Sequence, residues 1–506
     1  MVKLFLTESL LVFFLSDIRK NRKDVFMPDN STPKHQHNKM GTEPIGKLLL
    51  SRSLPAMFSM LIQALYNIVD SIFIGHGGGA RAISGLALTF PLMNLAAAFG
   101  SLVGVGAATL VSMRLGQRDY ETAQRILGNV VVLNLIIGIS IGLLTLVFLD
   151  PILYFFGASD ATIGYAREYM SVILWGNVVT HMYLGLNAVL RAAGHPRKAM
   201  YATILTVTIN AILDPLFIFG FGWGIRGAAI ATVLAQILAL VWQFRIFLDW
   251  NDLLHFRRGI YRLKGKIVRN VLAIGMSPFL MNLAACFIVI LINKGLKEYG
   301  GDLNIGAYGI VNRLGFFFVM IVMGINQGMQ PIAGYNYGAR QFDRVDRVLK
   351  MTIIGATCVT TLGFLIGELA PRLAVSVFTD DPELVRLSAE GMRIVFFCFP
   401  IIGFQMVTTN FFQSIGMAGK AIFLSLSRQL LFLMPGLIFL PRIFDELTPW
   451  DGSWGVWCSM PLSDFLASLV AGVMLFCQFR KFKAKAAAGR GEVSGAEVEN
   501  DRRVNE

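Results

Sequence analysis

The chain has 506 residues, of which 55% are hydrophobic and 15% charged, and its formal net charge is +13. Soluble globular chains carry roughly 45–50% apolar and about 25% charged residues, so this composition argues against a large soluble enzyme, a disordered chain and a disulfide scaffold. A basic chain often binds nucleic acid, but in a membrane protein the same excess gathers in cytoplasmic loops. The position of the charge therefore decides between these classes.

Apolar stretches of about 20 residues, the length that crosses a bilayer, recur along the chain. None of the segments between them is large enough for a soluble domain, so we expect an all-α membrane protein with twelve transmembrane helices. The predicted spans are 54–75, 83–111, 128–149, 168–190, 199–221, 226–248, 271–294, 305–332, 351–370, 391–413, 421–441 and 455–479.

Lys and Arg are distributed unequally between alternate connections. If both termini are inside, the inside connections hold 35 of the 45 basic residues and the outside connections and helix ends hold 10. Because cytoplasmic loops carry the excess of Lys and Arg, this split predicts that both termini are cytoplasmic. We therefore expect a multi-pass protein of the cytoplasmic (inner) membrane, surrounded by lipid and without a nucleic-acid partner.

The two ends of the chain have a different composition. Residues 4–15 are too short to span a bilayer and contain Glu8, and no small-residue cleavage motif follows them. Residues 1–45 are expected to be a disordered extension, with Met1, Met27 and Met40 all open as the start of translation. Residues 481–506, rich in Ala, Gly and Glu, are expected to form a disordered cytoplasmic tail.

An internal repeat organises the rest of the chain. LGQRDYETAQRIL at 115–127 matches YGARQFDRVDRVL at 337–349, with identical residues 222 positions apart that include Arg118 and Arg340. A duplicated unit of six helices enters the membrane twice from the same side, which predicts two lobes related by a pseudo-two-fold axis along the membrane normal. The expected divisions are an N-lobe at 46–250, a cytoplasmic inter-lobe loop at 251–270 and a C-lobe at 271–480.

Two carboxylates lie within predicted apolar helices, where ionisable groups are costly and usually functional. Asp70 ends a stripe of polar residues on one helix face, formed with Gln63, Tyr66 and Asn67. Asp214 ends a second stripe and is followed by Pro215, which disfavours helical geometry at that point.

A local break at Pro215 would leave carbonyl groups free, and Thr232 lies on the next predicted helix. Two carboxylates, Asn210 and Thr232 could therefore form a site for a proton or for Na⁺, which prefers oxygen ligands. The alternative is that Asp70 and Asp214 only form hydrogen bonds at helix breaks.

The C-lobe differs at the equivalent positions. Asn293 stands where the N-lobe has Asp70, and Arg428 and Gln429 lie near the place of Thr206. Asp464 remains open as a secondary polar site in the last span. The roles of Arg313 and Glu368 stay open as well, with a structural role favoured for Arg313 and an interfacial position for Glu368.

The five cysteines show no CxxC or Cys/His spacing, so we expect small buried apolar residues and neither a metal cluster nor a cofactor. Met and Phe are abundant, and flexible thioethers and aromatic faces suit a cavity for apolar cations. The residues expected to line a substrate cavity are Gln63, Tyr66, Asn67, Met281, Asn282 and Asn293.

Several segments together resemble the MATE family of multidrug and toxic compound extrusion transporters, and its MepA-like branch. These segments are SLPAMFSMLIQALYNIVDSIFIG (53–75), RLGQRDYETAQRIL (114–127), LRAAGHPRKAM (190–200), NAILDPLFIFGFGWGIRGAAIAT (210–232), NIGAYGIVNRLGFFF (304–318) and GMQPIAGYNYGAR (328–340).

The resemblance implies a two-lobed exporter that opens alternately to each side and exchanges lipophilic, often cationic drugs for H⁺ or Na⁺. It places the family's N-lobe cation site on Asp70, Asn210, Asp214 and Thr232, with Tyr169 as a further member. Some branches add carboxylates in the C-lobe, but Asn282 and the stretch around Cys398 offer none here.

The leading hypothesis is a monomeric secondary multidrug antiporter with small drug-like substrates. A lipid-linked oligosaccharide flippase of the related superfamily is the alternative, but a pyrophosphate-binding cavity should be basic, whereas this chain keeps two acids in its N-lobe. A membrane enzyme is not supported, because no paired nucleophile and base occurs.

Overall fold

The computed structural model describes residues 39–504 except 157, 161, 251 and 450, and leaves out the side chains at 67–69, 71–72, 75–84, 87–88, 302 and 481–504. Within this part the chain forms helices joined by short connections, without a strand. The N-terminal extension lies outside the described residues up to position 38.

The helices follow one another in two sets, one for each lobe. The N-lobe contains α4 (Ile45–Gly116), α5 (Tyr120–Val147), α6 (Leu149–Phe155), α7 (Ile163–Trp175), α8 (Asn177–Ala192), α9 (Pro196–Pro215), the π-helix η1 (Leu216–Gly220) and α10 (Gly224–Phe247). The C-lobe contains α11 (Gly265–Gly338), α12 (Phe342–Leu369), α13 (Pro371–Ser376), α14 (Pro382–Phe396), α15 (Phe399–Ser414), α16 (Ala418–Leu426), the π-helix η2 (Ser427–Leu433), α17 (Met434–Leu447) and α18 (Gly452–Val504).

Within the described residues, ten helical segments are long and apolar enough to cross a membrane, and two bent pairs bring the total to twelve. Both α4 and α11 hold two spans each: Ile45–Tyr66 and Thr89–Gly116 in α4, and Gly265–Gly301 and Leu303–Gly338 in α11. Each of the twelve predicted spans overlaps one of these, so the all-α fold class is confirmed.

The predicted fourth and tenth spans are bent rather than straight. The angle between α7 and α8 is 55°, and that between α14 and α15 is 52°. The first bend is at Gly176, where a β-carbon would lie 2.5 Å from the side chain of Val233, and the second is at Cys398, 222 residues further on. The internal repeat therefore extends to the positions of the bends.

The backbone repeats in the same way at two connections. Gly194 and Gly416, 222 residues apart, have φ angles of 95° and 76°. Arg118 and Arg340 are the only residues other than glycine with positive φ in the described chain. These four positions confirm that the second six-helix unit has the local geometry of the first.

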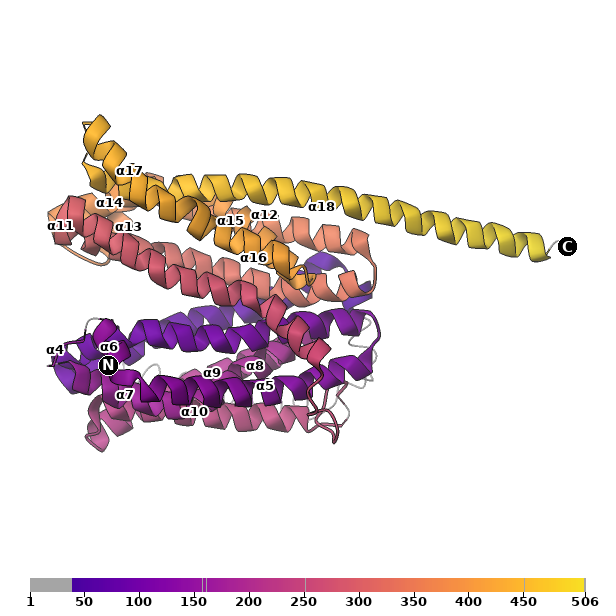
Figure 1. The fold of residues 1–506 in the computed structure, drawn as a ribbon, viewed down its shortest axis with the longest axis horizontal. Helices are drawn as coiled ribbons and strands as arrows, with labels where there is room; N and C mark the ends of the chain where they lie inside the picture. Colours follow the sequence, from indigo (N-terminus) through magenta and orange to yellow (C-terminus); the bar gives the residue numbers. More distant parts are fainter. Residues whose placement is uncertain (1–38, 157, 161, 251, 450, 505–506) are drawn as a thin grey trace.

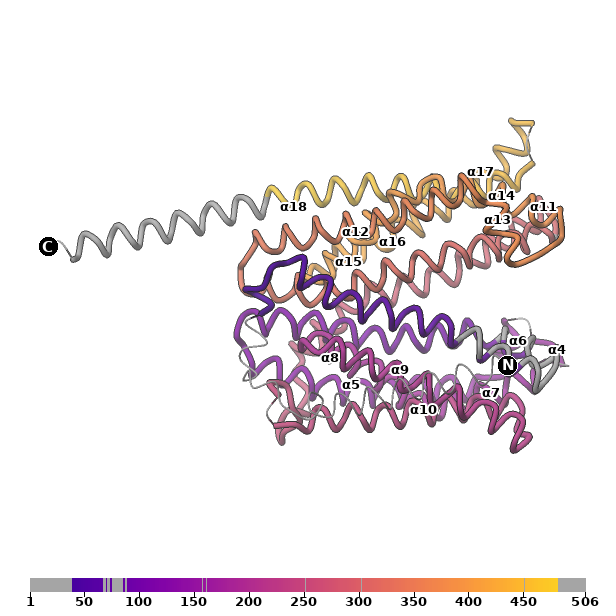
Figure 2. Tube along the Cα trace, turned by 180° about the vertical axis from the view of Figure 1, so that it is seen from behind, coloured from indigo at the N-terminus to yellow at the C-terminus, as the bar shows by residue number. Residues whose placement is uncertain are grey.

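The two lobes lie side by side as two layers of helices, with α4 to α10 in one and α12 to α18 in the other (Figure 1). The view from behind shows the same division (Figure 2). We call the end that carries the connections 117–119, 248–264 and 339–341 the connector face; α18 extends beyond it through Val504. This helix runs into the tail predicted to be disordered; its side chains there are not described, and the tail remains a prediction.

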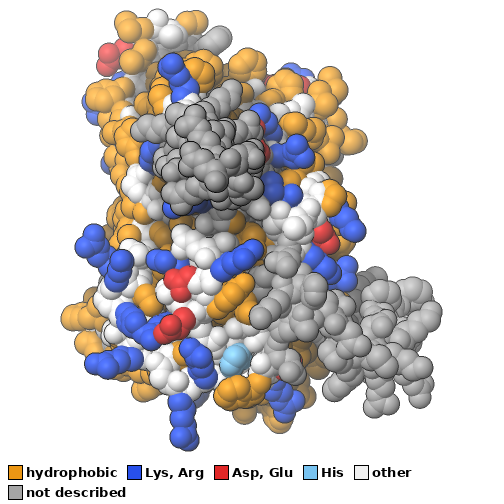
Figure 3. Space-filling view, turned by 90° about the vertical axis from the view of Figure 1, so that its right-hand side faces the viewer, with side chains coloured by type: hydrophobic (Ala, Val, Ile, Leu, Met, Phe, Trp, Pro, Cys, Tyr) orange, Lys and Arg blue, Asp and Glu red, His pale blue; other side chains and the backbone are white. Residues whose placement is uncertain are grey.

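Basic residues gather on the connector face. Figure 3 shows Lys and Arg side chains spread across it, and Arg118, Arg257, Arg258, Arg262 and Arg340 are exposed there. Basic side chains are thus exposed at the end of the bundle that carries these connections. That this end is cytoplasmic stays a prediction.

The cysteines only partly fulfil their prediction. All five are free, but Cys358 and Cys477 are exposed and the other three are half-buried. Since the outer surface of a membrane bundle meets lipid, an apolar cysteine there needs no burial in protein.

Candidate functional site

The predicted N-lobe polar residues come together from three helices. Asp70 lies on α4, Asn210 and Asp214 on α9, and Thr232 on α10. The Asn210 side-chain amide donates to Asp214 Oδ1 at 3.1 Å and to Thr232 Oγ1 at 3.3 Å. The carboxyl groups of Asp70 and Asp214 also lie close enough to interact with one another. We call these four residues the N-lobe cluster.

Two tyrosines complete the surroundings of the cluster. The Tyr66 hydroxyl lies 3.2 Å from Thr232 Oγ1. Tyr169, on α7, is fully enclosed at 1% exposure and interacts electrostatically with both Asp70 and Asp214. The structure therefore brings Tyr169 to the cluster, as the family resemblance implies, and adds Tyr66, which the sequence placed in the substrate cavity.

The cluster contains buried oxygen atoms without a donor. Asp70 is 8% exposed, Asn210 1% and Asp214 0%. In the described part of the chain, Asp70 Oδ1, Asn210 Oδ1 and Asp214 Oδ2 have no hydrogen-bond partner. Leaving a buried polar atom unsatisfied costs about 1–3 kcal/mol, and more when it is charged. Such a set of acceptor oxygens can be satisfied by a proton or by a cation.

No fixed positive charge balances the two acids within the described residues. The ion pairs found there join Lys, Arg and His to carboxylates other than Asp70 and Asp214. An isolated carboxylate is unfavourable in a low-dielectric interior, and a proton or a bound cation could neutralise the cluster.

The backbone beside Asp214 departs from α-helical geometry where the sequence predicts it. Helix α9 ends at Pro215, and the following turn is the π-helix η1, in which the Phe221 amide donates to the Leu216 carbonyl at 3.0 Å. Proline cannot supply an amide donor to the preceding turn, which favours a change of helix type here. Single-turn π segments often occur at functional sites.

The other predicted cavity residues lie on α4 and α11. Gln63 is half-buried on α4, and the side chain of Asn67 is not described. Met281, Asn282 and Asn293 lie half-buried on α11. Asn282 donates to the carbonyl of Pro278 in its own helix at 2.8 Å. Their assignment to a substrate cavity stays a prediction.

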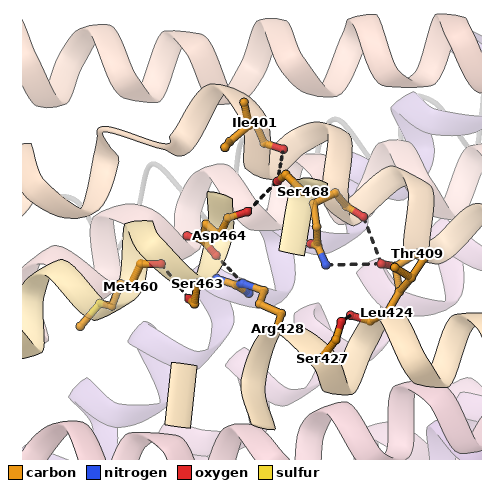
Figure 4. Close-up of polar contacts among 10 residues, drawn as sticks. Ile401, Thr409, Leu424, Ser427, Arg428, Met460, Ser463, Asp464 and Ser468 are labelled. Atoms are coloured by element: carbon orange, nitrogen blue, oxygen red, sulfur yellow. Dashed lines mark hydrogen bonds and ion pairs between the residues drawn. The ribbon is translucent and has the colours of Figure 1, made fainter. Parts of the chain in front are cut away.

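A second charged group lies within the C-lobe. Arg428 Nε donates to Asp464 Oδ1, and Asp464 is 3% exposed. Figure 4 shows the two side chains pointing toward one another. The sequence suggested each residue separately, and the structure brings them together because η2 places Arg428 opposite α18. Residues 36 positions apart on different helices show no spacing signal, and only their opposite charge could have suggested the pair.

The lobes meet closely near the connector face. A β-carbon on Gly106 would overlap the carbonyl oxygen of Val271, and one on Gly275 would overlap that of Leu102. Gly116 and Gly338, equivalent in the repeat, are each packed against the backbone of the other lobe in the same way. These glycines allow helix backbones of α4 and α11 to touch, so this end of the bundle is tightly closed.

The segment 39–44, which we call the strap, ties the lobes together at the same end. The Met40 side chain is fully buried in an apolar cluster built mainly from the N-lobe. Its carbonyl accepts from the C-lobe residues Asn336 and Arg344, at 3.1 Å each. Arg344 also donates to the Glu43 carbonyl at 2.7 Å.

Two six-helix lobes with a buried acidic cluster between their helices have the architecture of a membrane transporter. The MatE family model matches residues 55–216 and 275–438, one stretch in each lobe. The chain therefore belongs to the MatE family.

Relatives and solved structures agree with this assignment. The multidrug export protein MepA of Staphylococcus aureus (strain NCTC 8325 / PS 47) is 28% identical over 86% of this chain and 94% of its own length. MepA of Staphylococcus haemolyticus is 27% identical over 85% and 93%.

Among solved structures, the MATE multidrug transporter DinF-BH, solved in complex with a ligand, is 37% identical, with a TM-score of 0.79 over 86% of this chain and 96% of that one. A MATE structure in the bent conformation has a TM-score of 0.83 at 23% identity, covering 89% and 99%. The second of these likenesses shows the shared fold alone.

Proposed function

We propose that this protein is a secondary multidrug exporter that exchanges lipophilic, often cationic compounds for H⁺ or Na⁺ by alternating access. The N-lobe cluster carries the coupling part of this proposal, because three buried acceptor oxygens converge there without a donor. Multidrug export, the activity in the name of the MepA relatives, supports the choice of substrate class, as does the ligand complex of the DinF-BH multidrug transporter.

The chemistry of the cluster fits either ion. Two apposed carboxyl groups share a hydrogen bond only when one of them holds a proton. Na⁺ would instead bind the carboxylate oxygens of Asp70 and Asp214 together with the oxygens of Asn210 and Thr232, since hard cations prefer oxygen ligands. Both ions remove one negative charge from the interior, which lowers the cost of holding two acids together.

Binding at the cluster can be coupled to movement because the cluster joins separate helices. Asp70 belongs to α4, whereas Asn210 and Asp214 belong to α9. A proton or Na⁺ between them holds α4 against α9, and its loss leaves two like charges that push the helices apart. Since α4 also forms the closed contact with α11, its displacement can reach the junction of the lobes.

The closed junction near the connector face supports alternating access. The glycine contacts and the strap lie at this end, which the charge asymmetry predicts to be cytoplasmic. Opening toward the cytoplasm then requires the backbones at Gly106 and Gly275 to separate. It also requires the strap to lose its contacts with one of the two lobes. Transport follows if ion binding and substrate binding favour opposite states of this junction.

The flippase alternative is less well supported. A cavity for a lipid-linked pyrophosphate needs fixed positive charge, whereas the N-lobe cluster contains two acids without a basic partner among the described residues. Arg428, a half-buried base within the C-lobe helices, is already paired with Asp464.

Efflux of a fluorescent cation from everted membrane vesicles tests the proposal. We expect transport to respond to an imposed pH gradient or to an imposed Na⁺ gradient, applied separately. Asp214→Asn should abolish transport and drug resistance while membrane expression stays normal. Asp380→Asn, an exposed position after α13, is the matched control and should transport normally. Unchanged efflux in the Asp214→Asn protein would disprove the assignment.

A further inference from the structure

Arg428 and Asp464 form a charge pair in the C-lobe, whereas the N-lobe has Thr206 at the repeat position of Arg428. Asp464 is 3% exposed on α18, and Arg428 approaches it from the π-helix η2 with its Nε atom (Figure 4). The side chain of Arg428 is 33% exposed. The pair thus lies within the C-lobe helices, at a depth where each charge alone would be costly.

Among the groups around the pair, Arg428 is the fixed positive charge that balances Asp464. Tyr308, on α11, interacts electrostatically with Arg428, and Cys398, between α14 and α15, interacts with Asp464. Ser463 and Ser468 on α18 donate to backbone carbonyls rather than to the carboxylate. Within the described chain, Arg428 is the only basic side chain paired with Asp464.

The two lobes therefore differ in what neutralises their buried carboxylates. A buried carboxylate is neutralised by a proton, by a metal ion or by a protein cation. The N-lobe cluster has two acids, unsatisfied oxygens and no basic partner among the described residues. In the C-lobe a guanidinium supplies the positive charge, and arginine stays protonated under all physiological conditions.

The local backbone differs between the lobes at this point too. Residue 206, which occupies the place of Arg428 in the repeat, is a threonine inside regular α9 and bonds to its own helix. In the C-lobe the equivalent turn is the seven-residue π-helix η2. The N-lobe helix stays regular at this turn and becomes π-helical only at Leu216, so the arginine and the π-helical turn coincide in the C-lobe.

We propose that Arg428 acts as a tethered cation that keeps Asp464 permanently neutralised, so that the C-lobe takes up no coupling ion and the N-lobe cluster alone does. This inference rests on the proposed ion-coupled transport, and it limits coupling to one site per molecule. It also makes Arg428 a positioning residue, since it acts through Asp464 and not on the substrate.

Counting bound protons and Na⁺ in the purified full-length protein tests the inference. Arg428→Met removes the guanidinium charge, so that the Asp464 carboxylate is neutralised only by binding a proton or another cation. We expect this variant to take up one proton more than the wild type in a weakly buffered titration, or to bind one additional radiolabelled Na⁺. The double variant Arg428→Met/Asp464→Asn should return to the wild-type number.

Repeating the measurement in an Asp214→Asn background separates this inference from the proposed function. If the N-lobe cluster does not couple transport, the Asp214→Asn protein shows the same efflux as the wild type, and the proposed function fails. If Arg428 neutralises Asp464, the Arg428→Met substitution adds one bound ion both in the wild-type protein and in the Asp214→Asn protein. Absence of the extra ion in both backgrounds overturns the role of Arg428.

The double variant also tests the inference if Arg428→Met alone does not fold, because it leaves no unpaired charge at the site of the Arg428–Asp464 pair. We expect it to transport with the wild-type number of ions per substrate molecule. A smaller number, or uncoupled transport, would show that Asp464 belongs to the coupling machinery and would overturn the proposal.

Discussion

Arg118 and Arg340 adopt the same left-handed backbone conformation, with φ angles of 59° and 60°, although 222 residues separate them. Each follows a long helix that ends at a glycine of the lobe junction, Gly116 or Gly338. A residue with a β-carbon costs about 1–2 kcal/mol in this conformation. The same strain is therefore present at the same turn of both repeats.

Replacing Arg118 by glycine should stabilise the protein. Glycine adopts positive φ without a steric penalty, so we expect Arg118→Gly to raise the free energy of unfolding by up to about 1 kcal/mol after the greater freedom of the unfolded chain is counted. Thermal unfolding in detergent measures the change. Arg347→Gly, an exposed position inside α12, should instead lose about 1 kcal/mol. Equal losses in both variants would contradict the strain.

A side chain at Gly275 should force the lobe junction open. The β-carbon of Gly275→Val would overlap the carbonyl oxygen of Leu102, and backbone atoms cannot move aside without separating α4 from α11. A cysteine at Thr109, which is fully buried at this junction, reports on the opening in a chain whose five cysteines are replaced by serine. We expect a soluble maleimide to label it faster in the Gly275→Val protein.

Gly309→Val is the control for that experiment. Gly309 lies on the second span of α11, and a β-carbon there meets no atom within 4 Å. Labelling of the cysteine at position 109 should therefore stay slow. Equal labelling rates in the Gly275→Val and Gly309→Val proteins would show that the glycine contacts do not hold the junction closed.

Removing the Arg344 guanidinium should release the strap. Arg344 makes hydrogen bonds to the carbonyls of Met40 and Glu43 and to the side chain of Asn336. Bonds to charged groups contribute about 1.5–3 kcal/mol each, so Arg344→Met should speed hydrogen exchange at the Glu43 amide by about tenfold or more. Arg347→Met, one turn further along α12 and exposed, should leave that exchange rate unchanged.

The free energy of unfolding should decrease at acidic pH, in part because Asp252 becomes protonated. Burial alone would raise the pKa of this loop carboxyl, but the hydrogen bond from His195 and the charges of His195 and Lys198 outweigh it and lower the pKa to about 2. Asp252 lies 3.0 Å from His195 Nε2 and 3.1 Å from Lys198 Nζ. Because the folded-state pKa is below the ordinary value of 3.8, the carboxylate stabilises the fold above about pH 4.

The contribution of Asp252 is lost as the pH falls from 4 toward 2. We expect Asp252→Asn to lower the free energy of unfolding by roughly 2 kcal/mol at pH 7, and the difference from the wild type to shrink through this range. Thermal unfolding of both proteins from pH 7 to pH 2.5 measures it. A difference that stays constant with pH would show that the ion pairs are not its source.

The sequence predicted the helices better than their shapes. Each predicted span overlaps a helix, because a stretch of about 20 apolar residues has few alternatives in lipid. The bends at Gly176 and Cys398 and the π-helix η2 could not be predicted in this way. Straight, bent and π-helical segments bury the same apolar residues, and the choice among them depends on neighbouring helices such as α10 beside Gly176.

The N-lobe cluster was predicted because its polar residues form stripes within otherwise apolar helices, at Asp70 on α4 and at Asn210 and Asp214 on α9. Thr232 was expected beside them from the next predicted helix, and the family resemblance implies the same set. The hydrogen bonds of Asn210 show that Asn210, Asp214 and Thr232 lie together. The C-lobe pair could not be predicted, since neither Arg428 nor Asp464 belongs to a stripe that identifies its partner.

The amino-acid sequence by itself determined the membrane class, the twelve spans, the duplicated lobes and the two buried acids, because hydropathy and repeat spacing are properties of the chain alone. Only the tertiary structure decided which charges are balanced. The cost of a buried charge depends on what lies within a few ångströms of it, and those neighbours come from other helices. Asp464 therefore meets a fixed guanidinium, while Asp70 and Asp214 meet each other.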